Sequence, residues 1–95
     1  MTRKSLSFEA FTLDLERLCL RGTSGQVNLR PKSFEVLRYL VEHAGRVVTK
    51  AELLEHVWAD LNVEESNLTV QIAALRKLIG ARAIATVPGV GYQLT

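Results

Sequence analysis

A helical periodicity in residues 65–80, ESNLTVQIAALRKLIG, constrains the fold more than any other feature of the chain. Large aliphatic residues recur there at intervals of three or four positions, namely Leu68, Ile72, Leu75 and Ile79. This spacing places them on one stripe of an α-helix. The opposite side carries mostly small or cationic residues, namely Ser66, Asn67, Thr69, Val70, Ala73, Ala74, Arg76 and Lys77. The sequence therefore predicts a helix that buries one side and presents an acid-free face on the other.

Two interpretations of this helix are open from its periodicity alone. It is either an ordinary amphipathic core helix or a helix whose small side chains allow close approach to another surface. The major groove of DNA is such a surface, because it is wide enough to admit a helix. Charge favours the second interpretation: residues 1–65 hold nine basic and ten acidic residues, whereas residues 66–95 hold three basic residues and no acid. The field is weak, because strong nucleic-acid binders usually carry a denser basic patch.

Length and composition exclude several classes of protein. The chain has 95 residues, 47% of them hydrophobic, which suffices for one domain with a single modest core. The single cysteine, Cys19, excludes an intrachain disulfide and a cysteine-based zinc site. No apolar run reaches the length of a membrane span, and no apolar segment follows the basic N-terminus as in a signal peptide. We expect a cytoplasmic domain, alone or at the cytoplasmic end of a longer, membrane-anchored chain.

No pattern of catalytic or ligand-binding residues accompanies these features. His43 and His56 fall on different predicted helices, and no Ser or Cys stands in a triad pattern with His and Asp. The pair Gly89-x-Gly91 is better explained as a hairpin turn than as a phosphate-binding loop. We expect no enzyme, no cofactor, no metal and no small-molecule ligand.

The first part of the chain predicts a small antiparallel sheet. Apolar residues tend to alternate over residues 5–29, which is the period of a β-strand. Three or four short strands are expected, near 5–8, 10–14, 17–21 and 26–28. Turns are expected between them, at 9–10, 15–16 and 22–25.

Two helices and a hairpin complete the expected fold. Pro31 suits the first turn of a helix that Gly45 caps. A short strand at 46–48 then precedes a helix over 50–58, for which Thr49 and Glu52 predict a capping box. After the helix at 65–80, residues 83–87 and 92–94 read as strands on either side of a tight turn.

The predicted fold class is α+β, with the layout of a winged helix-turn-helix. A single domain over residues 1–95 contains an N-terminal antiparallel sheet at 5–29, a core of three helices at 31–80 and a C-terminal hairpin wing at 83–95. Three runs of the sequence resemble the OmpR/PhoB-type DNA-binding domain of bacterial transcription regulators: LRPKSFEVLRYLVEHAGRVVTKAELLEHVW, NLTVQIAALRKLIG and IATVPGVGYQLT. They cover nearly the whole chain in the right order.

The resemblance implies a function and partners. It implies a four-stranded N-terminal sheet, a third helix that enters the major groove and a hairpin that reaches the minor groove of double-stranded DNA. It also implies that the loop at 59–65 can contact RNA polymerase and that copies bind tandem sites as head-to-tail pairs. Because the domain begins at Met1 without a preceding receiver, we expect the branch in which it is followed by another module.

The resemblance also assigns roles to particular residues. Six positions match those that face bases in the family, with Arg76 at a position that contacts bases or backbone: Ser66, Val70, Ala73, Ala74, Arg76 and Lys77. Six match backbone-contacting or polar flanking positions: Lys50, Trp58, Asn67, Gln71, Thr86 and Tyr92. From its own context, Trp58 reads equally well as a half-buried side chain with a free indole N–H or as an aromatic residue at the edge of the core.

Several residues depart from the family pattern. Members often have two arginines where this chain has Ala73 and Ala74, and usually one where Pro88 or Val90 stands. The loss of these phosphate and base contacts predicts weaker binding to DNA. The methyl groups of Val70, Ala73 and Ala74 favour contact with thymine, so we expect a preference for AT-rich sites. The alternative is a winged-helix module that binds protein, which the missing arginines and the acidic loop at 59–65 favour.

Overall fold

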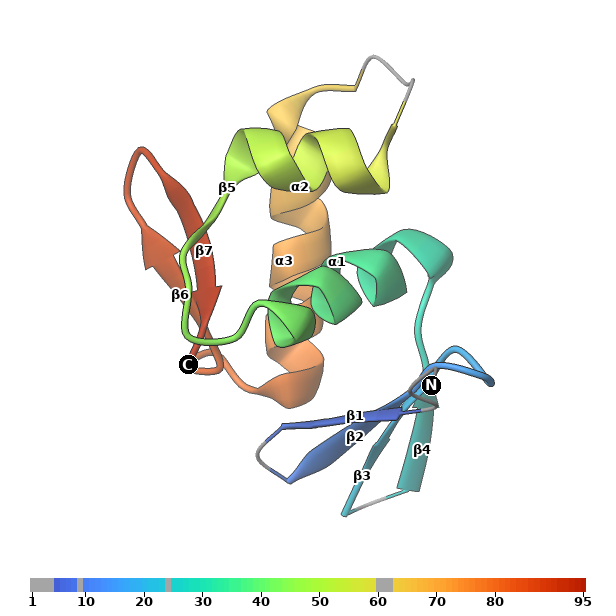
Figure 1. Ribbon diagram of the computed structural model, residues 1–95. Helices are drawn as coiled ribbons and strands as arrows, with labels where there is room; N and C mark the ends of the chain where they lie inside the picture. The colour runs from blue at the N-terminus through green and yellow to red at the C-terminus, as the bar shows by residue number, and fades with distance from the viewer. Residues whose placement is uncertain (1–4, 9, 24, 60–62) are drawn as a thin grey trace.

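The chain folds into an N-terminal sheet, three helices and a small C-terminal sheet over the residues that the computed structural model describes, 5–8, 10–23, 25–59 and 63–95 (Figure 1). The first sheet consists of β1 (Ser5–Phe8), β2 (Phe11–Asp14), β3 (Cys19–Gly22) and β4 (Gly25–Asn28). The helices are α1 (Pro31–Glu42), α2 (Lys50–Val57) and α3 (Glu65–Ile79). The second sheet contains β5 (Val48–Thr49), β6 (Ile84–Val87) and β7 (Gly91–Leu94). This order confirms the predicted α+β, winged-helix fold.

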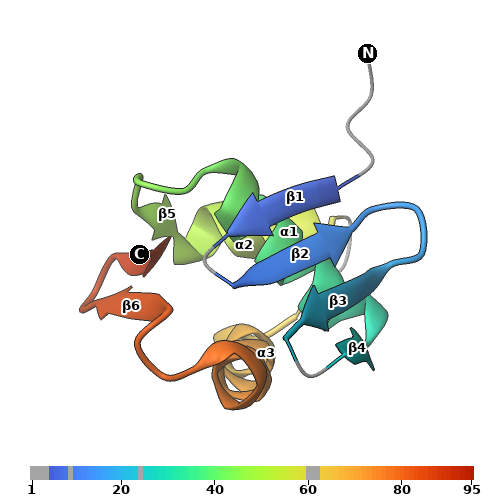
Figure 2. The ribbon, with the colours of Figure 1, turned by 90° about the horizontal axis from the view of Figure 1, so that it is seen from below.

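The N-terminal sheet directs its alternating apolar residues to the core. It is antiparallel in the order β1-β2-β3-β4 and lies below α1 (Figures 1 and 2). Leu6 lies opposite Leu13, and Leu13 lies opposite Leu20 on the next strand. All three leucines are buried, as the period of two requires.

Asp14 delays the start of the third strand relative to our prediction. The strand was expected over 17–21, but β3 begins at Cys19. Asp14 Oδ1 accepts hydrogen bonds from the backbone N–H groups of Glu16 (3.0 Å) and Arg17 (2.9 Å), which hold the chain in a turn. Leu18 then takes a positive φ of 54°. The turn predicted at 15–16 therefore extends through Leu18. Parts of the turns predicted at 9–10 and 22–25, at residues 9 and 24, lie outside the described residues.

Local sequence determines where the first two helices begin. α1 begins at Pro31 as predicted but ends at Glu42, with His43 as its C-cap residue. His43 Nδ1 lies 2.8 Å from the Tyr39 carbonyl oxygen, so His43 occupies the C-cap position that we expected for Gly45. The capping box of α2 is confirmed: Glu52 N–H donates to Thr49 Oγ1 (3.1 Å), and the Glu52 carboxylate accepts from Thr49 N–H (3.4 Å).

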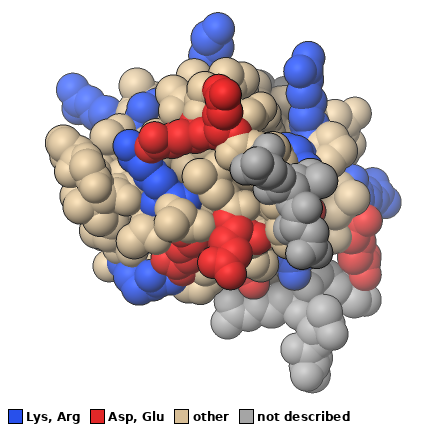
Figure 3. Space-filling model, turned by 90° about the horizontal axis from the view of Figure 1, so that it is seen from above, with Lys and Arg blue, Asp and Glu red and all other residues tan. Residues whose placement is uncertain are grey.

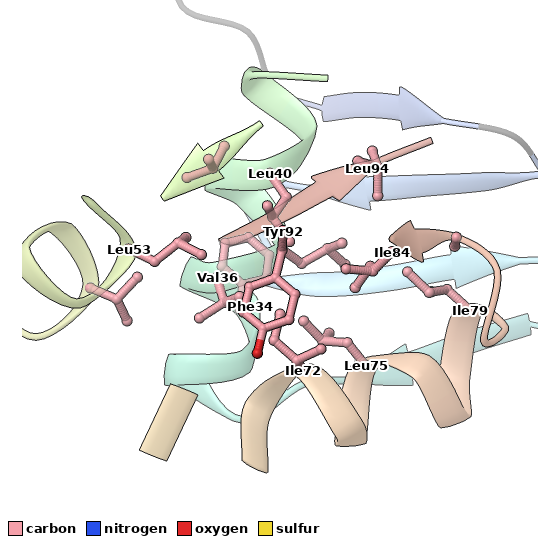
Figure 4. Close-up of a cluster of buried hydrophobic side chains, with 14 of the residues drawn as sticks. Phe34, Val36, Leu40, Leu53, Ile72, Leu75, Ile79, Ile84, Tyr92 and Leu94 are labelled. Carbon is pink, nitrogen blue, oxygen red and sulfur yellow. The ribbon is translucent and has the colours of Figure 1, made fainter. Parts of the chain in front are cut away.

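The apolar stripe of α3 forms the centre of the core, as predicted. Its residues are each at most 6% exposed: Leu68, Ile72, Leu75 and Ile79. They belong to one cluster with Phe34 and Leu40 of α1 and with Ile84, Tyr92 and Leu94 of the C-terminal sheet (Figure 4). Each such aliphatic side chain contributes about 1.5–3 kcal/mol on burial, which exceeds the contribution of a surface ion pair.

The C-terminal hairpin is joined to the start of α2 by a third strand. We expected a short strand at 46–48, and β5 lies at Val48–Thr49, where it pairs with β7 in the sheet order β5-β7-β6. Lys50 N–H also donates to the Val90 carbonyl oxygen at 3.1 Å. Gly91 permits this approach, because a Cβ atom there would collide with the Val48 carbonyl oxygen and lie 2.8 Å from Thr49 Cα. The glycine that the sequence explains as part of a turn therefore has a second role.

The Glu52 carboxylate ties α2 to the preceding loop and to α1. Arg46 donates to it twice, from Nη1 to Oε1 (3.2 Å) and from Nη2 to Oε2 (2.6 Å). The Tyr39 hydroxyl donates to Oε2 as well. The hydrogen bonds from Arg46, then from Tyr39, lower the pKa of Glu52 from 4.5 to about 2, against the opposing effect of burial.

Loss of the Glu52 charge should make folding less stable in acid. A carboxylate whose pKa falls from 4.5 in the unfolded chain to about 2 in the folded protein stabilises fully above pH 4.5, and this contribution disappears as the pH falls through about 2. We expect E52Q to lower the free energy of unfolding at pH 7 by about 1 kcal/mol and to flatten its pH dependence in that window. Urea unfolding at several pH values measures both effects. Glu55, exposed on the same helix, provides the control E55Q. A pH profile of E52Q that matches wild type would contradict the assignment.

Candidate nucleic-acid interface

The outward face of α3 is uncovered and free of acid from Ser66 onward. Figure 2 looks along α3 and shows no described element on its outer side. The predicted base-facing residues exposed there are Ser66, Val70, Ala73, Ala74 and Lys77. Val70 is 62% exposed, a larger fraction than that of the other exposed large hydrophobic residues that the structure describes. The helix therefore presents the small and cationic surface that its sequence predicts.

A shallow concavity runs along one side of this face. It has a volume of about 530 Å³ and lies between α3 and the segment that connects β4 to α1. Val70, Ala73 and Lys77 line it from α3, and Arg30 and Ser33 line it from the other side. None of its lining residues is acidic. A surface of this kind can accept apolar groups and anions side by side.

Arg76 lies apart from the other predicted base-facing residues. Its side chain is half-buried and turned toward the C-terminal sheet. Nε and Nη2 donate to the Ile84 carbonyl oxygen, and Nη2 also donates to Thr86 Oγ1. The structure therefore places Arg76 between α3 and β6, away from the face that carries Ser66 and Val70.

Two of the predicted backbone-contacting residues are in the core. Trp58 and Tyr92 are each 6% exposed and belong to the main hydrophobic cluster. Of the two readings of Trp58, the structure supports the aromatic residue at the edge of the core. The half-buried position expected for its side chain is not observed. Tyr92 belongs to the same cluster in Figure 4.

Lys50 is paired with the first residue of α3. Lys50 Nζ lies 2.6 Å from Glu65 Oε1, and the hydrogen bond to Glu65 raises the pKa of Lys50. Both side chains are partly exposed, so solvent screens the pair. Glu65 was missed as a site residue, although an acid in the first turn of a helix is favoured by the helix dipole. It neutralises one of the cations expected to hold phosphate.

The remaining predicted contacts lie around the ends and edges of α3. Gln71 is half-buried, and its side-chain oxygen accepts a hydrogen bond from the hydroxyl of Ser33, a buried residue of α1. Its amide N–H groups are not used in that bond. Asn67 is exposed, and its Nδ2 donates to the Glu64 carbonyl oxygen at 3.3 Å. Thr86 is exposed on β6. Nothing in the sequence pattern singled out Ser33.

The face over α2 has the opposite character. Figure 3 shows acidic side chains in the middle of this face and basic ones around its edge. Two hollows in this region each contain two acids: Glu52 and Glu55 line one, and Glu35 and Glu42 line the other together with Arg38. Such a surface disfavours a polyanion. Within the loop at 59–65, residues 60–62 lie outside the described residues.

Neither a metal site nor a membrane span is found in the part of the chain that the structure describes. No group of three or more His, Cys, Asp or Glu side chains there could hold a metal ion. No described helix has the length and apolar content needed to cross a membrane.

Fold and surface together define a winged-helix module of the DNA-binding kind, and comparison with known proteins gives its family. Residues 24–94 match the family described as "Transcriptional regulatory protein, C terminal". The chain is 38% identical over 97 residues to the transcriptional regulator HilA of Salmonella typhi, which covers 98% of this chain and 17% of HilA. It is 34% identical over 88 residues to the sensory transduction protein RegX3 of Mycobacterium tuberculosis, which covers 86% of this chain and 39% of RegX3.

Solved structures agree with this result. The DNA-binding domain of Escherichia coli CadC has a TM-score of 0.88 at 25% identity, covering 100% of this chain and 94% of that one. The Klebsiella pneumoniae RstA DNA-binding domain, solved in complex with the RstA box, has a TM-score of 0.83 at 27% identity, covering 98% of each chain. The chain belongs to the OmpR/PhoB-type family of DNA-binding domains of transcription regulators. It spans less than a fifth of the length of HilA.

The Lys50–Glu65 pair generates a prediction for this family of DNA-binding domains. E65Q removes the acid at the first position of α3 and releases the charge of Lys50, so affinity for DNA should rise roughly two- to fivefold. Fluorescence anisotropy with a duplex selected by the wild-type domain from a random pool measures the change. Glu35 pairs with Lys32 on the outward side of α1 at 3.3 Å, so E35Q is a matched control. Equal affinities of E65Q and wild type would show that Lys50 lies outside the interface.

Proposed function

We propose that this chain is the sequence-specific DNA-binding domain of a transcription regulator, with α3 in the major groove and the hairpin at 83–95 at the minor groove. The observation that carries the proposal is the uncovered, acid-free face of α3 between Ser66 and Lys77. A major groove about 12 Å wide accepts one α-helix when its outward side chains are short. Binding to chromosomal DNA would make the domain cytoplasmic.

The chemistry of this face favours AT-rich sequence. Val70, Ala73 and Ala74 present aliphatic groups that can contact thymine methyl groups but cannot form bidentate hydrogen bonds with guanine. Lys77 is the exposed cation on the same side of α3. Ser66 and Asn67 supply exposed polar groups near the start of the helix.

Affinity of one domain for one site should be modest. The family resemblance implies arginines at the positions of Ala73 and Ala74 and at either Pro88 or Val90, and this chain has none of them, so fewer phosphates would be neutralised. Glu65 pairs with Lys50, which reduces the available positive charge further. Head-to-tail pairing on tandem sites would compensate, because the second binding event becomes effectively intramolecular.

Contact with RNA polymerase is proposed for the loop at 59–65. Its charge supports this role, since the segment contains Asp60, Glu64 and Glu65 and no base. An acidic loop beside the DNA-binding helix is better suited to a basic protein surface than to phosphate.

A second candidate function is a winged-helix module that binds protein. Exposed aliphatic side chains on α3 favour it, because Val70 is 62% exposed and Leu78 is 41% exposed. Contiguous exposed apolar surface often marks a protein interface. The two candidates differ in salt dependence, because counterion release accompanies DNA binding.

Selection of duplexes from a random pool, followed by titration, tests the proposal. We expect an AT-rich consensus and an affinity that falls steeply between about 50 and 200 mM salt. K77A should weaken binding about tenfold, whereas R38A, on the outward side of α1, should leave it unchanged. A domain without measurable DNA affinity at low salt would favour the protein-binding candidate. Nanomolar binding of one monomer to a GC-rich site at about 150 mM salt would contradict weak, AT-leaning recognition.

A further inference from the structure

We infer that Arg76 is a positioning residue that holds the C-terminal hairpin against α3, and that it does not read bases. The inference rests on the proposed function in one respect, because it assumes that α3 and the hairpin meet DNA together. It replaces the base-facing role expected for Arg76 from the family motif. Figure 2 shows β6 next to α3.

Three hydrogen bonds and one ring contact join the Arg76 guanidinium to the hairpin. Nε and Nη2 donate to the Ile84 carbonyl oxygen at 3.1 and 2.7 Å. Nη2 also donates to Thr86 Oγ1 at 2.7 Å. The guanidinium carbon lies 5.9 Å from the centroid of the Tyr92 ring, within the range of a cation–π contact. Because Tyr92 is the cross-strand partner of Thr86, Arg76 contacts both strands of the hairpin.

The Ile84 carbonyl is available to Arg76 because β6 is an edge strand. The sheet order β5-β7-β6 leaves one side of β6 unpaired. Thr95 N–H donates to the Ala83 carbonyl oxygen at 3.0 Å, so the Ala83 carbonyl points toward the partner strand. The carbonyl of the next residue, Ile84, then points to the open side, because successive residues alternate in an antiparallel pair. Arg76 satisfies this carbonyl and links the open edge to α3.

Arginine has the geometry for this role and lysine does not. The planar guanidinium presents several N–H groups in a rigid fork, so it can bind a carbonyl and a hydroxyl at once. An ammonium group at the same place would lack that fork and would be strongly hydrated. R76K therefore keeps the positive charge and removes the link.

The hydrogen bond from Arg76 leaves the Thr86 hydroxyl as a donor toward DNA. Because Oγ1 accepts a hydrogen bond from Arg76, its own O–H remains available to donate. Thr86 is exposed, and a phosphate oxygen is an acceptor suited to that donor. The hairpin residues 84–94 contain no Lys or Arg, so Arg76 also supplies positive charge to a hairpin that has none.

The first test uses the domain without DNA and measures amide hydrogen exchange by NMR. R76A and R76K should raise exchange rates in β6 and β7 about tenfold, while α3 retains wild-type rates. K77A, which changes the neighbouring exposed cation, should leave the hairpin unaffected. T86V, which lacks the hydroxyl, should show a smaller increase, whereas T86S, which keeps it, should not.

Two results of this test would overturn the inference whether or not the domain binds DNA. One is wild-type exchange in the hairpin of R76A. The other is a uniform increase over α3 and the hairpin, which would indicate a general loss of stability.

The second test adds a duplex that the wild-type domain selected from a random pool. The Arg76 Nε–H resonance should stay in place when DNA is added, because its partner remains the Ile84 carbonyl. R76K should bind about tenfold more weakly and lose hydroxyl-radical protection at the flank of the site that the hairpin covers, while the centre stays protected. A large shift of the Arg76 resonance, or a wild-type footprint for R76K, would show direct contact with DNA instead. If the wild type selects no duplex, the proposed function fails, and the exchange test still decides the role of Arg76.

Discussion

Burial of the apolar stripe of α3 against α1 and the C-terminal sheet is the interaction on which the rest of the structure depends. Leu68, Ile72, Leu75 and Ile79 occupy the centre of the core, so the helix has only one orientation in which its apolar side leaves water. The opposite face is then necessarily outward. Its small side chains, none of them acidic from Ser66 onward, are exposed to solvent only because the stripe holds the helix in this orientation.

A few hydrogen bonds and ion pairs hold the elements around α3 in fixed relative positions. Glu52 joins α2 to Arg46 and Tyr39, Lys50 joins the start of α2 to Glu65 and, through its backbone, to Val90, and Arg76 joins α3 to β6. Gly91 allows β5 and β7 to approach. A single hydrogen bond stabilises by only about 1 kcal/mol, but each of these links orients two elements whose apolar packing is non-directional. These links therefore fix the placement of the C-terminal hairpin relative to α3. Simultaneous contact of the two elements with two grooves of DNA would depend on that placement.

The sequence predicted the fold well where the signal is local and regular. The helical stripe at 65–80, the capping box of Thr49 and Glu52 and the start of α1 at Pro31 were confirmed, because short-range sterics and hydrogen bonds determine them. The predicted boundary of a strand was wrong where a side chain binds backbone N–H groups that the strand would otherwise use, as Asp14 does before β3. Contacts between elements were missed: the partner of β5 and the bond between Ser33 and Gln71 join residues far apart in the chain. The contact of Arg76 with β6 spans only eight residues, but it depends on how the chain turns after α3.

Periodicity and composition alone determined that this chain has a helix with one apolar stripe and one acid-free face, and motif order determined its family. Those properties depend on residue identity and spacing, which a sequence contains in full. Tertiary structure alone decided which polar side chains are free to meet DNA. Lys50, Trp58, Arg76 and Tyr92 match contact positions by motif, but an ion pair, burial or internal hydrogen bonds engage them within the fold. The physical reason is that the availability of a side chain depends on its neighbours in space, and these come from segments that the sequence keeps apart.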